Sequence, residues 1–93
     1  MRTNEIQFSL TYRQEAIRIF SFPSYKAYIR IGRLGFGADI EIDSLLVSRQ
    51  HAEIEVVAPD RLILRDQQST NGTYVNGLQI QEASLSPGDV ISF

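Results

Sequence analysis

The sequence predicts an all-β protein with little or no helix, and three observations support this. Apolar and polar residues alternate in several segments, as from Ile6 to Leu10, and alternation with a period of two is typical of half-buried strands. No window longer than about ten residues keeps apolar positions at helical spacing without an interruption by Gly, Pro or a β-branched residue. Turn signals such as Asn71-Gly72 recur about every ten residues, which indicates a sandwich or a barrel of short strands.

Each expected strand shows this alternation or a short apolar run, and turn residues separate it from the next. In the clearest case Ala52, Ile54 and Val56 face one way while the intervening glutamates face the other. The expected strands are Ile6 to Tyr12, Ala16 to Phe22, Ala27 to Ile31, Asp39 to Ile42, His51 to Val57, Arg61 to Asp66, Thr73 to Val75 and Val90 to Phe93. The turns between them fall at sites such as Pro23-Ser24, Gly35-Phe36-Gly37, Pro59-Asp60 and Asn76-Gly77.

The composition is that of an ordinary folded globular domain. The 93 residues fit one domain, residues 1–93, and 43% of them are hydrophobic while 22% are charged. Nine basic and eleven acidic residues give a net charge of −2, which does not suit a protein that wraps a nucleic-acid backbone. We therefore expect no nucleic-acid partner, and any anion site must be local.

The residue types also limit which metal sites and membrane-spanning segments are expected. The chain has no Cys and a single His, so neither a disulfide nor a thiolate or His-rich metal site is expected, and no cofactor is implied. No apolar run approaches the roughly 20 residues that span a bilayer. The segment from Met1 to Leu10 lacks the apolar core and the cleavage pattern of a signal peptide. We expect a cytoplasmic protein that does not insert directly into a membrane.

Two polar segments at strand ends carry candidate anion-binding groups. Arg33 follows an expected strand, and Gly32 beside it frees the backbone to turn sharply. Ser48 and Arg49 stand between an apolar run and the next strand. A hydroxyl with two guanidinium groups suits a phosphate. Taken alone, Arg33 is better explained as a solvated surface residue after a turn, because most Arg side chains are exposed, and Arg49 has the same alternative explanation.

The chain's one histidine raises the alternative of a hydrolase with Ser48 as nucleophile, His51 as base and Asp66 as the orienting acid. Residues three apart point to opposite sides of an extended strand, and the sequence has no G-x-S-x-G elbow and no oxyanion-hole signature. We do not expect an enzyme. His51 is interpreted as a structural residue whose ring nitrogens fix a loop by hydrogen bonds.

A second polar loop follows Asp66, where Ser69, Thr70 and Asn71 supply short side chains that bond to backbone groups. Asn71-Gly72 tolerates positive φ and marks a tight turn, and Asn76-Gly77 marks another. Taken alone, these segments predict hairpins and no ligand.

Three segments in this order resemble the forkhead-associated (FHA) domain family. They are Gly32-Arg33, the S-R-Q-H-A segment from Ser48 to Ala52, and the S-T-N-G-T-Y-V-N-G segment from Ser69 to Gly77. The segment from Leu85 to Ile91 is similar to the late L-x-x-G-D-x-I segment of that family, so the resemblance covers Ala27 to Phe93. It implies an antiparallel β-sandwich whose loops at one end bind phosphothreonine in partner proteins.

The resemblance also implies a role for individual residues. Arg33, Ser48 and Arg49 match positions that contact the phosphate, and the position of Arg49 varies within the family. Thr70 would approach the phosphothreonine and Asn71 would bind the peptide backbone, while His51, Gly72 and Asn76 would hold the loops in shape. Leu46 would meet the third side chain after the phosphothreonine.

One feature departs from the family pattern. Family members usually carry one more strand after the L-x-x-G-D-x-I segment, and that strand pairs near the N-terminal one. Here the sequence stops at Ile91-Ser92-Phe93. We expect that the last strand is missing, and an exposed edge or a strand supplied by a partner chain would follow.

Three functions remain open at this point. The leading one is a phosphothreonine-dependent adaptor domain, part of a larger protein or signalling system with a Ser/Thr kinase. The second is a phosphate-independent scaffold or assembly module that binds through the sandwich face or its open edge. The third is the hydrolase that uses Ser48 and His51.

Overall fold

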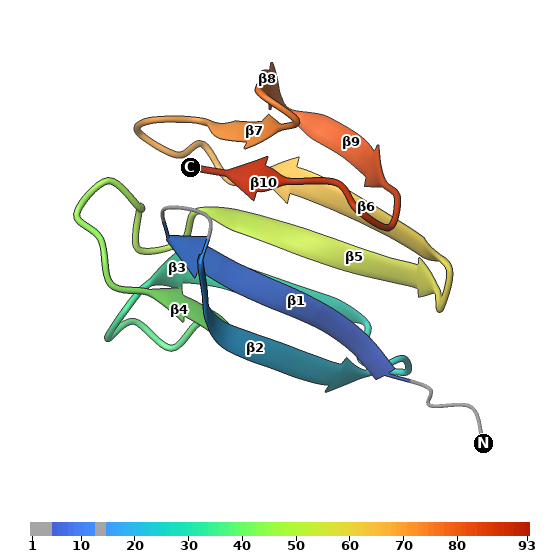
Figure 1. The fold of residues 1–93 in the computed structure, drawn as a ribbon. Helices are drawn as coiled ribbons and strands as arrows, with labels where there is room; N and C mark the ends of the chain where they lie inside the picture. Colours follow the sequence, from blue (N-terminus) through green and yellow to red (C-terminus); the bar gives the residue numbers. More distant parts are fainter. Residues whose placement is uncertain (1–4, 13–14) are drawn as a thin grey trace.

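The computed structural model describes residues 5–12 and 15–93, and these residues form ten strands (Figure 1). In chain order they are β1 (Glu5–Tyr12), β2 (Glu15–Pro23), β3 (Tyr28–Arg33), β4 (Ile40–Ile42), β5 (Ala52–Ala58), β6 (Arg61–Asp66), β7 (Thr73–Val75), β8 (Leu78–Ile80), β9 (Glu82–Leu85) and β10 (Ile91–Ser92). Among the described residues, none belongs to a helix long and apolar enough to cross a membrane. The prediction of an all-β fold is confirmed.

The strands pair into three sheets. The largest has the order β4-β3-β5-β6-β9, the hairpin β1-β2 forms the second, and the third has the order β10-β7-β8. All pairs are antiparallel except β3 with β4, which run parallel with Ile31 opposite Ile40. The expected antiparallel β-sandwich is therefore confirmed, with one parallel pair at the edge of the large sheet.

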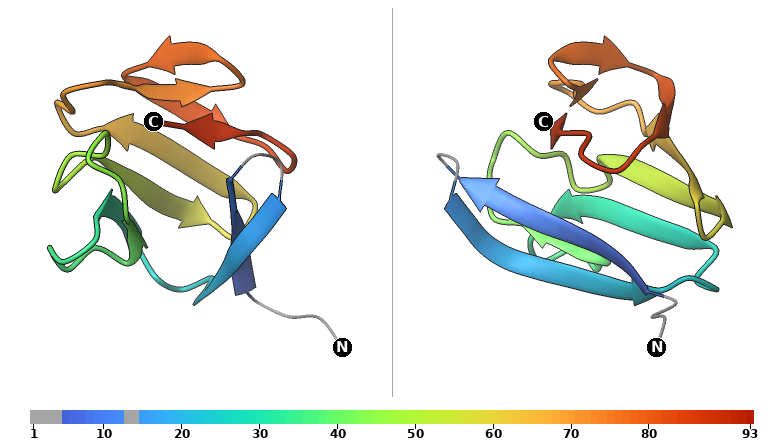
Figure 2. Two further views of the ribbon diagram at one scale, coloured as in Figure 1. Left: turned by 60° about the vertical axis from the view of Figure 1, so that its left-hand side comes forward. Right: turned by 45° about the vertical axis from the view of Figure 1, so that its right-hand side comes forward.

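The core lies on the inner face of the five-stranded sheet. Ile29, Ile54 and Leu64 are opposite one another on β3, β5 and β6, and each is 0% exposed. The hairpin lies across this face (Figure 2) and adds Phe20 to the same cluster. Partly buried side chains of the third sheet, among them Val75, pack against it as well. One apolar cluster thus joins all three sheets and provides the main stabilisation through burial.

The outer face of the same sheet carries paired charges. Arg65 on β6 donates to Glu55 at 2.8 Å and to Glu82 at 2.6 Å, and Arg30 lies 3.5 Å from Glu53. Because successive side chains of a strand point to opposite faces of the sheet, these charged residues lie on the face away from the buried isoleucines. The face is therefore solvated, and its ion pairs stabilise the fold only modestly.

Two strands were not expected from the sequence. The strands β8 and β9 are short, none of their side chains is fully buried, and Leu78 at the start of β8 is 73% exposed. Segments of three or four residues are too short for alternation to identify them as strands, and pairing with neighbouring strands makes them extended. Most boundaries also differ by one or two residues, and two of these differences concern candidate site residues. Arg33 is the last residue of β3 rather than following it, and His51 precedes β5.

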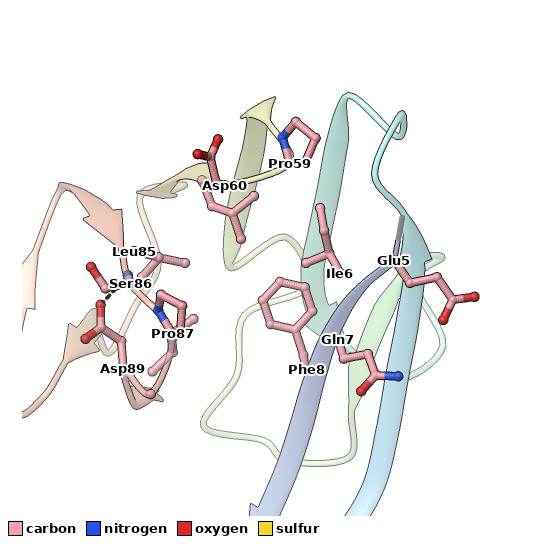
Figure 3. Close-up of a pocket in the computed structure, with 13 residues that line it drawn as sticks. Glu5, Ile6, Gln7, Phe8, Pro59, Asp60, Leu85, Ser86, Pro87 and Asp89 are labelled. Carbon is pink, nitrogen blue, oxygen red and sulfur yellow. Dashed lines mark hydrogen bonds between the residues drawn. The ribbon is translucent and has the colours of Figure 1, made fainter. Parts of the chain in front are cut away.

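A groove of about 340 Å³ lies between β1 and the turn that joins β9 to β10. Figure 3 shows Ile6 and Phe8 on one wall and Leu85 on the other. Within the described residues, β1 pairs only with β2, and β10 pairs only with β7. The strand edges on the two sides of the groove therefore have no strand between them in the described part of the chain.

Candidate functional site

Three segments meet at one end of the sandwich, on the left in Figure 1. They are the end of β3, the loop of residues 43–51 and the loop of residues 67–72. The N–H of Arg33 donates to the Ser48 carbonyl at 3.0 Å, and the N–H of Thr70 donates to Ser48 Oγ at 3.0 Å. The Asn71 side-chain amide donates to the Leu46 carbonyl at 2.9 Å. These bonds join segments that are far apart in the sequence into one surface.

Arg33 is held at this surface by its own side chain. Its Nε donates to the Val47 carbonyl at 2.8 Å, and the residue is half-buried. This bond uses one of five guanidinium N–H donors and leaves the terminal nitrogens for a ligand. No described carboxylate lies within ion-pair distance of Arg33. The guanidinium is fixed in place, and its charge is available to an anion.

Gly32 is needed for a reason other than the expected turn. It is buried within β3, and a Cβ built on it would lie far inside van der Waals contact with the Arg49 carbonyl oxygen and 3.0 Å from the Arg49 carbonyl carbon. The loop backbone therefore approaches β3 more closely than any side chain at position 32 would allow. This close approach brings Ser48 and Arg49 beside Arg33.

Ser48 connects the two loops and keeps a donor for a ligand. Its Oγ accepts the N–H of Thr70, so the hydroxyl hydrogen is not used in that bond. The residue is half-buried, whereas Thr70 is exposed. A hydroxyl donor and a guanidinium thus lie at adjoining positions of the same surface.

His51 is 0% exposed and bonds to the loop of residues 43–51 and to the loop of residues 67–72. Its Nδ1 accepts the N–H of Ser48 at 2.9 Å, which assigns the proton to Nε2, and Nε2 donates to the Gly72 carbonyl at 2.8 Å. The Phe93 ring packs edge-on against the imidazole, with 4.9 Å between centroids. His51 thus connects the backbones of the two loops.

The same contacts mean that His51 is not positioned to act as a general base for the Ser48 hydroxyl. Nδ1 faces the backbone of Ser48 and not its hydroxyl, and Nε2 is already bonded to Gly72. Asp66 accepts bonds from Ser69 and Thr73.

Asp66 organises the second loop, a role that the sequence analysis did not assign. Its carboxylate accepts the N–H of Ser69 at 3.1 Å, the Ser69 hydroxyl, and the hydroxyl of buried Thr73 at 2.7 Å. Ser69 Oγ in turn accepts the N–H of Gly72 at 3.0 Å. The spacing D-x-x-S is the available signal, because an Asp that bonds to the backbone a few residues later is typical of turns.

Burial alone would raise the pKa of the Asp66 carboxyl, but the hydrogen bonds from Ser69 and Thr73 outweigh it and hold the pKa below its ordinary value. A carboxyl whose pKa is lower in the folded state contributes stability that is full above its unfolded pKa of about 4 and is lost as the pH falls through the folded value. We expect Asp66→Asn to lower the free energy of unfolding at pH 6, and to lower it less at pH 3, because the contribution of the carboxylate decreases once the pH is below the unfolded pKa. Urea unfolding at both pH values checks this.

Asp60→Asn is the matched control for this measurement, because Asp60 is exposed and forms no hydrogen bond in the described part of the chain. An equal loss of stability at pH 3 and pH 6 in Asp66→Asn would contradict the assigned role of the carboxylate.

The remaining predicted residues divide into two groups. Arg49, Asn71 and Leu46 are exposed at the loop end, and Leu46 is 63% exposed. Asn76 lies instead at the far end of β7, where its side chain bonds to Val90 and to the Asp89 carboxylate. Hydrogen bonds and close backbone contacts join the predicted site residues other than Asn76, while the Arg49 side chain turns to the ring of Phe36. The described residues contain no group of three or more His, Asp or Glu side chains suited to a metal ion.

The structure is a β-sandwich that gathers guanidinium and hydroxyl donors on the loops at one end, which is the arrangement of a binding module. A family model for the FHA domain matches residues 29–93, and the chain therefore belongs to the FHA domain family. The resemblance inferred from the sequence is confirmed.

Comparisons with individual proteins agree with this assignment. The chain is 44% identical over 64 residues to the ABC transporter ATP-binding/permease protein Rv1747 of Mycobacterium tuberculosis, which covers 69% of this chain and 7% of that protein. The chain thus spans only a small part of this curated relative.

Two solved structures share the fold. The FHA domain of the CT664 protein from Chlamydia trachomatis has a TM-score of 0.79 at 27% identity, covering 95% of this chain and 86% of that one. A structure from a study of phosphothreonine-dependent FHA domain interactions has a TM-score of 0.74 at 35% identity, covering 86% of this chain and 79% of that one.

Proposed function

We propose that this domain binds phosphothreonine peptides through Arg33, Ser48, Arg49, Thr70 and Asn71. The observation that carries the proposal is that the Arg33 guanidinium is held in place without a neutralising carboxylate. Its guanidinium is anchored through Nε to the Val47 carbonyl, while none of the described carboxylates forms an ion pair with it. A fixed and unneutralised guanidinium beside a free hydroxyl donor suits a dianionic phosphate.

The expected energetics favour recognition that depends on phosphate. A hydrogen bond to a charged group contributes about 1.5 to 3 kcal/mol, so two or three such bonds give micromolar binding after the costs of ordering the peptide. Without the phosphate, the donors of Arg33 and Ser48 would face a neutral hydroxyl. The unphosphorylated peptide is therefore strongly disfavoured.

Fluorescence anisotropy tests this proposal. A degenerate, fluorescein-labelled phosphothreonine peptide library and its unphosphorylated twin are titrated with the folded domain. We expect saturable binding of the phosphorylated library and none of its twin over the same concentration range. Equal binding of both would refute the proposal and favour the phosphate-independent scaffold, for which the groove between β1 and the β9–β10 turn is the candidate surface.

The proposal includes no enzymatic activity. The contacts of His51 support this part, because both ring nitrogens are bonded to backbone groups and neither faces the Ser48 hydroxyl. A generic ester substrate should show no turnover that Ser48→Ala abolishes.

We further propose that the domain is part of a larger protein in a cytoplasmic signalling system with a Ser/Thr kinase. The small share of Rv1747 that the chain matches supports the first point. A domain that binds phosphothreonine depends on a kinase that phosphorylates its partner, which supports the link to a Ser/Thr kinase.

The peptide preference should depend on Leu46. This side chain is 63% exposed, and its carbonyl is bonded to Asn71, the residue proposed to bind the peptide backbone. A peptide carboxylate packed on a leucine would lose water without gaining a partner. We expect a peptide array to favour Ile or Leu over Asp at the third position after the phosphothreonine. A preference for Asp there would contradict this assignment of Leu46.

A further inference from the structure

The loop between β3 and β4, residues 34–39, presents an aromatic ring to the second arginine of the site. The Arg49 guanidinium carbon lies 4.9 Å from the centroid of the Phe36 ring. Phe36 is 50% exposed, so its ring is accessible at the surface. A guanidinium within about 6 Å of an aromatic face is attracted to it.

The backbone on both sides of Phe36 is fixed. Gly35 and Gly37 have φ values of 98° and 85°, and their N–H groups donate to the same Glu41 oxygen, at 2.8 Å and 3.3 Å. Nothing lies within 4 Å of a Cβ built on either glycine, so the glycines serve the backbone conformation and not a tight contact. The Glu41 carboxylate thus fixes the backbone conformation of the loop, and with it the position from which the Phe36 side chain extends.

In the described part of the chain, no ion pair or side-chain hydrogen bond holds Arg49. No described carboxylate lies within ion-pair distance of it. Arg49 and Phe36 line a pocket of about 460 Å³, in which the one carboxylate, Glu53, lies 3.5 Å from Arg30. The stacking interaction therefore decides where this long side chain lies before a ligand arrives, and a free arginine would lose more conformational entropy on binding.

We propose that Phe36 is a positioning residue of the phosphate site, which holds the Arg49 guanidinium in place for the phosphate and so raises affinity. This inference rests on the proposed phosphothreonine binding. It assigns a function to the β3–β4 loop, whose sequence Gly35-Phe36-Gly37 signals only a turn.

A double-mutant cycle tests the coupling, with the same labelled phosphothreonine peptide library as the probe. We expect Phe36→Leu to weaken binding by about two- to fivefold, Phe36→Trp to keep or improve it, and Phe36→Leu to have no effect in the Arg49→Ala background. Glu41→Ala, which frees the loop without changing the ring, should weaken binding in the same Arg49-dependent way. Thermal unfolding of each variant confirms that it is folded.

Each other outcome is informative. An equal loss for Phe36→Leu with and without Arg49 would overturn the inference, because the ring would then act on the peptide or the fold directly. Unchanged or tighter binding in Phe36→Leu would overturn it as well, since the ring would then hold the guanidinium away from the phosphate. In both cases binding that requires the phosphate and Arg33 would leave the proposed function intact. Binding independent of both would overturn the proposed function and this inference together.

Discussion

Arg33→Ala should reduce phosphopeptide affinity by about 100-fold or more while the domain remains folded. The substitution removes the guanidinium that is anchored to the Val47 carbonyl and leaves the phosphate without its charged partner. Losing one or two charge-assisted bonds of about 1.5 to 3 kcal/mol each accounts for an effect of this size. Anisotropy titration of the phosphorylated library with wild type and variant measures it.

Two further variants define the cause. Arg33→Lys keeps the charge but lacks both the planar fork and the Nε bond to Val47, so it should recover only part of the affinity. Arg61→Ala is the matched control, because Arg61 is an exposed arginine at the start of β6, at the opposite end of the sandwich from the loops (Figure 1). A comparable loss in Arg61→Ala would point to nonspecific attraction between the domain and an anionic peptide.

Gly32→Ala should destabilise the fold by about 2 kcal/mol or more and weaken phosphopeptide binding at the same time. The added methyl group would overlap the Arg49 carbonyl oxygen, and a backbone carbonyl cannot move aside without shifting the loop that carries Ser48. Urea unfolding and anisotropy on the same sample measure the two effects.

Gly77→Ala separates the effect of close approach from the general cost of replacing a glycine. Gly77 has a φ of 84°, and nothing lies within 4 Å of a Cβ built there. We expect it to lose about 1 kcal/mol through backbone strain and to keep its affinity, because it lies away from the loops. Normal binding by Gly32→Ala would show that the loop tolerates displacement from β3.

Strands with a strong pattern could be predicted from the sequence, and weakly patterned ones could not. The alternation of Ala52 and Ile54 with glutamates identifies β5, because one face is buried and the other carries ion pairs. The strand β8 has no comparable signal, since it is only three residues long and its first apolar residue, Leu78, is exposed. Its extended conformation depends on pairing with β7, which the local sequence does not encode.

The site divides in a similar way. Motif order identified Arg33 and Ser48, and the structure places them beside each other. The stacking of Arg49 on Phe36 could not be predicted, because it depends on how the β3–β4 loop folds against the β4–β5 loop. Asn76 shows the opposite limit: it was assigned with the recognition loop, although its bonds go to the turn before β10. Sequence position alone does not reveal which end of a short strand a side chain supports.

The central claim is that the phosphate binds at the loop end of the sandwich, and an NMR titration tests it most directly. A ¹⁵N-labelled domain is titrated with one phosphothreonine peptide and with its unphosphorylated twin. We predict that only the phosphorylated peptide shifts resonances, and that the largest shifts fall on the Arg33 side chain and the backbone amides of Ser48 and Thr70. Equal shifts from both peptides, or shifts concentrated on the groove around Phe8 and Leu85, would contradict the claim and identify a phosphate-independent interaction surface.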